Sequence, residues 1–137
     1  MSIHVYTDGS SKGNPGPGGW GVHVNIQGEI YEFHGRDEMT TNNKMELKAA
    51  IEGLKFFPKP EKLHLYTDST YVLNGITKWI NGWKKNGWKT AQKKEVKNME
   101  LWKELDILNS KHDVEWFKVK AHSGDYGNER ADYLATF

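Results

Sequence analysis

VYTDGSSKGNPGPGGWG, residues 5–21, is the stretch from which the fold can be worked out. A short apolar alternation leads into Asp8, and six glycines and two prolines then fall within residues 9–21. A simple hairpin turn needs far fewer such residues. We interpret the segment as a strand over residues 3–7 that ends at Asp8, followed by backbone that comes close to another group.

The same pattern returns later in the chain, because IHVYTDGS at 3–10 resembles LHLYTDST at 63–70. Asp8 and Asp68 therefore occupy equivalent positions, each at the carboxyl end of a strand, where open α/β sheets bind their ligands. Parallel neighbouring strands lie about 4.8 Å apart, so the two carboxylates would meet and repel each other unless a cation lies between them. The alternative is that each aspartate only caps a following helix.

Around these two strands, the chain alternates between strand and helix patterns. Gln27–Gly28 indicates a hairpin turn, and an apolar stripe with helical spacing ends at Pro58. Three hairpin-linked strands followed by α–β units predict an α/β fold with a mixed sheet, in a single domain over residues 1–137. Strands are predicted at 3–7, 20–26, 29–35, 62–67 and 114–119, and helices at 43–57, 69–85, 99–108 and 128–137.

Composition excludes several classes of protein. The 137 residues include no cysteine, so disulfides and thiolate metal sites are excluded. No apolar run is long enough to cross a bilayer, and the N-terminal MSIHVYTD lacks the features of a signal peptide. We therefore expect a cytoplasmic protein that has no membrane partner, and separately we expect it to be a monomer.

Two further carboxylates join the two aspartates as candidates. Glu46 heads a helix face of small residues, where a carboxylate is costly unless it is paired or binds a metal. The alternative is a first-turn glutamate that complements the helix dipole. Asp132 lies in the predicted last helix, but Asp125 and Glu129 are alternatives to it, and their spacing does not choose among them.

A set of hard oxygen ligands without cysteine favours Mg²⁺, with Mn²⁺ as a substitute, over zinc. Such a set suits a two-metal site for in-line displacement at a phosphodiester. A pair of carboxylates is also typical of glycosidases. A lysine-rich segment at residues 78–97 argues against a glycosidase, because sugars are neutral and nucleic acids are polyanions.

Residues 78–97 form a lysine-rich segment with seven lysines and one acid, although the whole chain has a net charge of only +1. Within it, KWINGWKKNGWKT (78–90) places Trp79 and Trp83 one helical turn apart. Lysines interleaved with aromatic residues are typical of a groove that follows phosphates and packs against sugars or bases. The alternative is a solvated lysine face over core tryptophans.

The chain resembles the type 1 ribonucleases H over essentially its whole length, in the bacterial form with a basic protrusion. The resemblance rests on six blocks in order: TDGSSKGNPGPGGWG, TTNNKMEL, YTDSTYV, ITKWINGWKKNGWKT, VKNMELW and VKAHSGDYGNERAD. It implies a ribonuclease H-like fold, with a five-stranded mixed sheet and helices on both sides. It also implies metal-dependent cleavage of the RNA strand of RNA/DNA hybrids, which leaves 3′-hydroxyl and 5′-phosphate ends.

By motif position, the resemblance implies a role for particular residues. Asp8, Glu46, Asp68 and Asp132 match the metal-binding carboxylates of the family, with two Mg²⁺ ions, and His122 matches its mobile catalytic histidine. The positions that match hybrid contacts are Gly9, Ser10, Asn14, Thr41, Asn42, Asn43 and Thr70, with Trp79, Trp83, Lys84, Lys85 and Lys89 on the side of the DNA strand.

The chain departs from the family at two places. Many members carry glutamine or a similar long polar residue where Thr70 stands, and many continue their last helix beyond the position of Phe137. Two other function classes stand beside a ribonuclease H. One is a hybrid-binding module without catalysis, and the other is a different nuclease of the same fold, such as a resolvase or an exonuclease.

Overall fold

The computed structural model describes residues 2–120 and 124–137. Its five-stranded sheet has the order β3-β2-β1-β4-β5, and β2 is antiparallel to both of its neighbours while β1, β4 and β5 are parallel. The fold prediction of a mixed sheet is therefore confirmed. The strands are β1 (Ile3–Ser11), β2 (Gly16–Ile26), β3 (Glu29–Thr40), β4 (Lys62–Thr67) and β5 (Asp113–Lys118).

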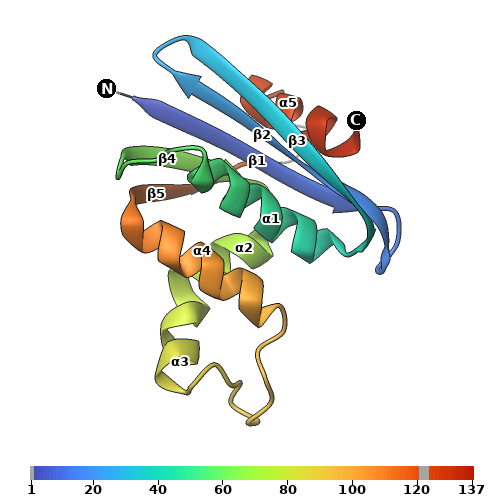
Figure 1. Ribbon diagram of the computed structural model, residues 1–137, viewed down its shortest axis with the longest axis vertical. Helices are drawn as coiled ribbons and strands as arrows, with labels where there is room; N and C mark the ends of the chain where they lie inside the picture. Colours follow the sequence, from blue (N-terminus) through green and yellow to red (C-terminus); the bar gives the residue numbers. More distant parts are fainter. Residues whose placement is uncertain (1, 121–123) are drawn as a thin grey trace.

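Helices cover both faces of the sheet (Figure 1). The helices α1 (Asn42–Lys55), α2 (Thr70–Asn74) and α4 (Met99–Lys111) lie on one face, and α5 (Tyr126–Thr136) lies on the other. The core forms between the sheet and α1 and α4, where Val5, Leu47, Leu65 and Trp102 are fully buried. The period-two alternation of the strands thus supplies one apolar face to this core.

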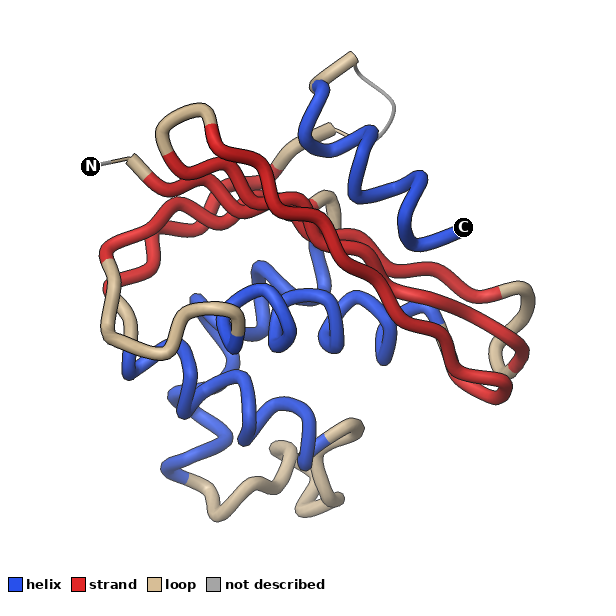
Figure 2. The backbone as a smooth tube through the Cα atoms, turned by 45° about the horizontal axis from the view of Figure 1, so that its top comes forward, coloured by secondary structure: helices blue, strands red, loops and turns tan. Residues whose placement is uncertain are grey.

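The lower part of the molecule in Figure 1 projects away from the sheet. It consists of a π-helical turn η1 (Gly75–Trp79), α3 (Ile80–Lys85) and the loop that returns to α4. In Figure 2 this projection is drawn as helix and loop and extends away from the red strands of the sheet. The predicted helical segment 69–85 is thus divided among α2, η1 and α3. No helix among the described residues is long and apolar enough to cross a membrane.

The glycine-rich segment differs from its prediction, because β1 does not end at Asp8. It continues to Ser11 and pairs there with β2, so that Asp8 faces Gly21 and Ser11 faces Gly18. A Cβ on Gly21 would overlap the backbone of Ala131 in α5. The glycines of β2 therefore serve strand pairing and the close approach of α5, and β2 begins at Gly16 rather than at the predicted Trp20.

Gly9 serves a second close approach, on the opposite face of the sheet. A Cβ at this position would overlap the backbone of Met45 and of Glu46 in α1. Deeper in the same interface, Gly53 brings α1 down on Val5. The small-residue face of α1 therefore lets the helix lie directly on β1, and it brings Glu46 beside the strand that carries Asp8.

Candidate active site

Three carboxylates meet where β1, β4 and α1 come together. Ligand oxygens of Asp8, Glu46 and Asp68 all lie within 4.8 Å of one another. Asp68 follows the last residue of β4, and β1 and β4 pair in parallel up to Thr7 and Thr67. The sequence prediction that Asp8 and Asp68 meet at neighbouring parallel strands is confirmed.

The helix-cap alternatives for these carboxylates are wrong. Ser69, and not Asp68, caps α2, since its hydroxyl accepts a hydrogen bond of 3.1 Å from the Val72 N–H. Asp8 lies within a strand. Glu46 lies beyond the first turn of α1, which contains no acidic residue, so the dipole alternative does not apply either.

Asp132 joins the cluster from the other face of the sheet. Its carboxyl lies close enough to Asp8 to help raise the pKa of that aspartate. Asp125, in contrast, caps α5, because its Oδ1 accepts a hydrogen bond of 3.1 Å from the Asn128 N–H. Glu129 is exposed to solvent. Of the three candidates that the spacing left open, Asp132 is thus the one that interacts with Asp8, and its role as a metal ligand stays a prediction.

The electrostatics of the cluster are those of crowded, buried acids. Burial, reinforced by the charges of Asp68 and Asp132, raises the pKa of Asp8 to about 9. Burial also raises the pKa of Glu46 well above its usual value, and the neighbouring charges of Asp8 and Asp68 add to this effect. Without a cation the cluster therefore retains protons, because like charges at this distance cannot all ionise.

The donor set fits a hard divalent cation. Among the described residues, Glu46 Oε1 and Asp68 Oδ1 are buried without a hydrogen-bond partner. A buried carboxylate oxygen without a partner is costly, and a bound cation removes that cost. Carboxylate oxygens without nitrogen or sulfur suit Mg²⁺ or Mn²⁺.

A polar cavity lies beside the N-terminus of α1. It has a volume of about 230 Å³. Asn42 Oδ1 accepts a hydrogen bond of 2.7 Å from the Ser11 N–H, and Asn14 Oδ1 accepts one of 2.9 Å from the Asn42 N–H. Hydrogen bonds between the glycine-rich segment and the start of α1 therefore hold this side of the cavity in place. Its lining residues are Asn14, Thr41, Asn42, Asn43, Lys97 and Asn98.

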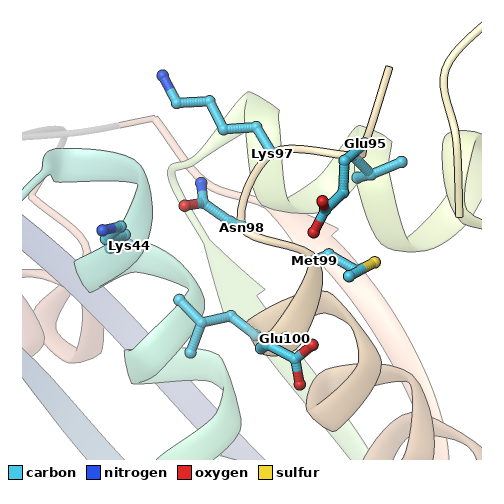
Figure 3. Close-up of a pocket in the computed structure, with 8 residues that line it drawn as sticks. Lys44, Glu95, Lys97, Asn98, Met99 and Glu100 are labelled. Carbon is cyan, nitrogen blue, oxygen red and sulfur yellow. The ribbon is translucent and has the colours of Figure 1, made fainter. Parts of the chain in front are cut away.

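Sequence reasoning missed the last two of these lining residues. Lys97 and Asn98 also line a larger neighbouring cavity of about 610 Å³, shared with Lys44 (Figure 3). Asn98 adopts a left-handed conformation with φ of 61° directly before α4. Asn98 lies beside residues 41–43 because the tertiary fold joins two segments that are far apart in the chain. The only signal for Asn98 in the sequence was its place in the VKNMELW block.

The remaining predicted contacts near the carboxylates differ in accessibility. Gly9 is buried, and its N–H donates a hydrogen bond of 2.9 Å to Asp8 Oδ1. Ser10 is half-buried, and Thr70 is exposed as the first residue of α2. Ser10 and Thr70 are thus open to a ligand, whereas the close contact of Gly9 is with α1.

In the lysine-rich segment, the structure supports part of each interpretation. Trp79 is 41% exposed. Trp83 is half-buried and packs on Trp102 in the core, with ring centroids 5.3 Å apart. Lys84 Nζ lies 3.2 Å from Asp106 Oδ2, which ties α3 to α4. Lys85 and Lys89 are exposed. His122, the predicted catalytic histidine, lies outside the described residues.

Together, the fold and the site define a class of α/β proteins that gather carboxylates at the carboxyl ends of adjoining parallel strands. Residues 1–137 match the family model of RNase H, and the chain belongs to the ribonuclease H family as a bacterial type 1 member. It is 58% identical over 133 residues to the Ribonuclease H of Wolbachia sp. subsp. Drosophila simulans, which covers 97% of this chain and 92% of that relative.

Solved structures resemble the fold. LC9-RNase H1, described as a type 1 RNase H with the type 2 active-site motif, is 34% identical, with a TM-score of 0.85 over 98% of this chain and 70% of the other. LC11-RNase H1, solved in complex with an RNA/DNA hybrid, is 23% identical, with a TM-score of 0.73 over 98% of this chain and 94% of the other. At that identity the second likeness shows the fold alone.

Proposed function

We propose that this chain hydrolyses the RNA strand of RNA/DNA hybrids by a two-metal mechanism that leaves 3′-hydroxyl and 5′-phosphate ends. The observation that carries the proposal is the group of Asp8, Glu46 and Asp68, whose ligand oxygens lie within 4.8 Å of one another. Membership of the ribonuclease H family supplies the reaction class. We further propose that the domain acts as a cytoplasmic monomer.

The carboxylates divide the task of holding two Mg²⁺ ions, for which Mn²⁺ can substitute. Asp8 is central, because it adjoins both Asp68 and Asp132. When bound, the ions supply charge stabilisation and an activated water for an in-line displacement. Glu46 and Asp68 hold oxygens that have no other partner among the described residues. Asp132 adds its oxygen from the opposite face of the sheet.

Recognition of the hybrid is assigned to surfaces on both sides of this cluster. The amide-rich cavity at the N-terminus of α1 offers donors and acceptors to a sugar–phosphate backbone and to 2′-hydroxyls, which distinguish RNA from DNA. Trp79, Lys85 and Lys89 offer an exposed ring and two exposed cations to the DNA strand. Trp83 and Lys84 support this surface through their contacts with α4.

His122 is proposed to move a proton or to release the product phosphate. An imidazole titrates near neutrality, and general acid–base assistance is typically worth about 10²–10⁴ in rate. Because the bound ions already activate the water, we expect His122→Ala to lower turnover by about 10² or less, with hybrid affinity nearly unchanged. Loss of binding with normal turnover at saturation would make His122 a substrate contact instead.

One assay separates this function from the other classes. Labelled RNA/DNA, RNA/RNA and DNA/DNA duplexes are each incubated with the protein and Mg²⁺, and with the Asp68→Asn variant as the control. We expect cleavage of the RNA strand of the hybrid alone, and none by the variant. Binding of the hybrid without cleavage would leave a binding module, whereas cleavage of DNA duplexes would indicate a different nuclease.

A further inference from the structure

A polar network of Glu32, Arg130 and His23 holds α5 to the sheet. Glu32 in β3 receives both arms of the Arg130 guanidinium, with Nε at 2.8 Å from Oε2 and Nη2 at 2.8 Å from Oε1. His23 Nδ1 lies 2.7 Å from the same Oε2. Glu32 thus connects β3 to both β2 and α5.

The protonation of this network follows from its hydrogen bonds. The Arg130 and His23 hydrogen bonds hold the pKa of Glu32 down to about 2, so that the carboxyl is ionised at neutral pH. An ionised carboxylate only accepts hydrogen bonds, so His23 Nδ1 carries the proton and donates it. The His23 side chain is only 2% exposed, which leaves the imidazole no room to turn away.

The network reaches into the sheet beside Asp8. The His23 ring meets the edge of Tyr6 in β1, with ring centroids 5.9 Å apart, and that of Tyr126 in α5 at 5.7 Å. Tyr6 precedes Asp8 by two residues on the same face of β1. His23 therefore contacts both of the elements that supply Asp8 and Asp132.

The seat of α5 allows little adjustment. The backbone of Ala131 lies against Gly21, which is the pairing partner of Asp8, so a Cβ at Gly21 would overlap Ala131. A Cβ at Gly127 would overlap the ring of Tyr6. At such close contact, a shift of α5 cannot be absorbed between helix and sheet, and it moves Asp132 relative to Asp8.

We infer that Glu32 is a positioning residue, which acts through Arg130 to hold Asp132 at the distance from Asp8 that a divalent cation requires. The inference rests on the proposed function, because it takes Asp132 as a ligand. Arg130 stands two residues before Asp132 on an 11-residue helix, so the Glu32 contact fixes both the rotation and the axial position of α5 near that carboxylate. A bidentate guanidinium–carboxylate contact suits this task, because it specifies direction as well as distance.

A role in stability alone makes a different prediction. It would lower the melting temperature of Glu32→Gln and leave the cation affinity of the folded protein unchanged. The test is therefore a Mg²⁺ titration of the folded, hybrid-free protein, followed by amide chemical shifts, beside a melting curve. Glu52→Gln is the matched control, since Glu52 lies on α1, which carries Glu46, and forms surface ion pairs of 3.3 Å with Lys48 and 3.6 Å with Lys55.

We expect Glu32→Gln to weaken Mg²⁺ binding about 3- to 10-fold, somewhat less than the loss of a group bonded directly to a ligand, which costs about 10–100-fold. Glu52→Gln should bind Mg²⁺ like the wild type. Arg130→Lys, which keeps the charge but removes the second hydrogen bond, should give an intermediate affinity. A lower melting temperature with unchanged Mg²⁺ affinity in Glu32→Gln overturns the inference.

The route through Asp132 is tested by a double-mutant cycle. In an Asp132→Asn background, Glu32→Gln should cause no further loss of Mg²⁺ affinity, because the oxygen that it positions is already changed. An equal loss in both backgrounds would mean that Glu32 acts by another route, and the inference fails. If the wild-type protein binds no Mg²⁺, the proposed function is overturned as well. If the wild type binds Mg²⁺ and Glu32→Gln binds it with the same affinity, only the positioning role is overturned.

Discussion

Tyr6 stacks on Tyr66 with ring centroids 4.5 Å apart and ring planes at 12° to each other. The two residues are register partners in β1 and β4, and each stands two residues before an aspartate of the cluster. Their contact is fixed by the same pairing that brings Asp8 and Asp68 together. The repeated motif in the sequence is thus a cross-strand pair in the structure. A hydrogen bond of 2.8 Å between the Tyr66 hydroxyl and His4 Nδ1 joins the same two strands.

The first prediction concerns the paired carboxylates. Asp8→Asn or Asp68→Asn should abolish Mg²⁺-dependent hydrolysis of the hybrid, because each removes a ligand oxygen with almost no change in volume. Without metal, the free energy of unfolding should hold or rise, since crowded negative charge is relieved. Denaturant unfolding with EDTA and a hybrid cleavage assay check the two parts. A variant that keeps near wild-type turnover would contradict the two-metal assignment.

The second prediction concerns the exposed lysines. Lys85→Ala with Lys89→Ala should weaken binding of every hybrid sequence alike, and the slope of log affinity against log salt should fall by about 0.9 for each phosphate that is no longer neutralised. Lys59→Ala with Lys62→Ala is the control, because it removes the same charge from exposed positions outside the lysine-rich segment. If the slope is unchanged in the Lys85/Lys89 variant, these lysines contact solvent and not the hybrid.

Lys84 is set apart from these two lysines by its ion pair with Asp106. Both side chains are partly exposed, so the pair adds about 1 kcal/mol or less to stability. Lys84→Ala should therefore act on the docking of α3 as well as on hybrid binding. A melting curve and a hybrid titration of the single variant separate the two effects.

The third prediction concerns the pH dependence of stability. The pKa of Glu32 falls from an ordinary 4.5 to about 2 in the folded protein, chiefly through its hydrogen bond with Arg130. Between these values the unfolded chain binds more protons than the folded one, so the stabilisation is complete above the higher pKa and is lost as the pH falls through the lower one. The difference in the free energy of unfolding between wild type and Glu32→Gln should therefore narrow as the pH is lowered from 5 to 2. Denaturant unfolding at intervals of about one pH unit measures it. A gap that stays constant over this range would show that the carboxylate charge contributes nothing.

The sequence predicted the element types well because the apolar periods are strong, and β4 has the predicted bounds. It failed at the end of β1, since glycine is usually a turn signal, and only the contacts with α1 and α5 explain why glycines lie within these strands. The pairing of Asp8 with Asp68 followed from a local motif. The Glu32–Arg130 contact and the place of Asn98 could not be predicted, because each joins segments that have no shared pattern in the chain.

The last prediction concerns Gly9, which the sequence placed at the hybrid and the structure places against α1. Gly9→Ala would drive a methyl group into the backbone of Met45 and Glu46. Because backbone cannot swing aside as a side chain can, α1 must move away from β1 and take the Glu46 carboxylate with it. We expect a loss of about 1–3 kcal/mol in stability, as overpacking of a well-packed interface typically costs.

Activity should fall further than this loss of stability alone explains, because Mg²⁺ affinity falls with the displacement of Glu46. Gly82→Ala is the matched control, since it also adds one methyl group, but in α3 with no atom within 4 Å. It should leave Mg²⁺ affinity unchanged and hold or raise stability, because alanine is the better helix former. If Gly9→Ala instead keeps wild-type Mg²⁺ affinity and loses only hybrid affinity, then Gly9 is a substrate contact and its packing against α1 is not what the site requires.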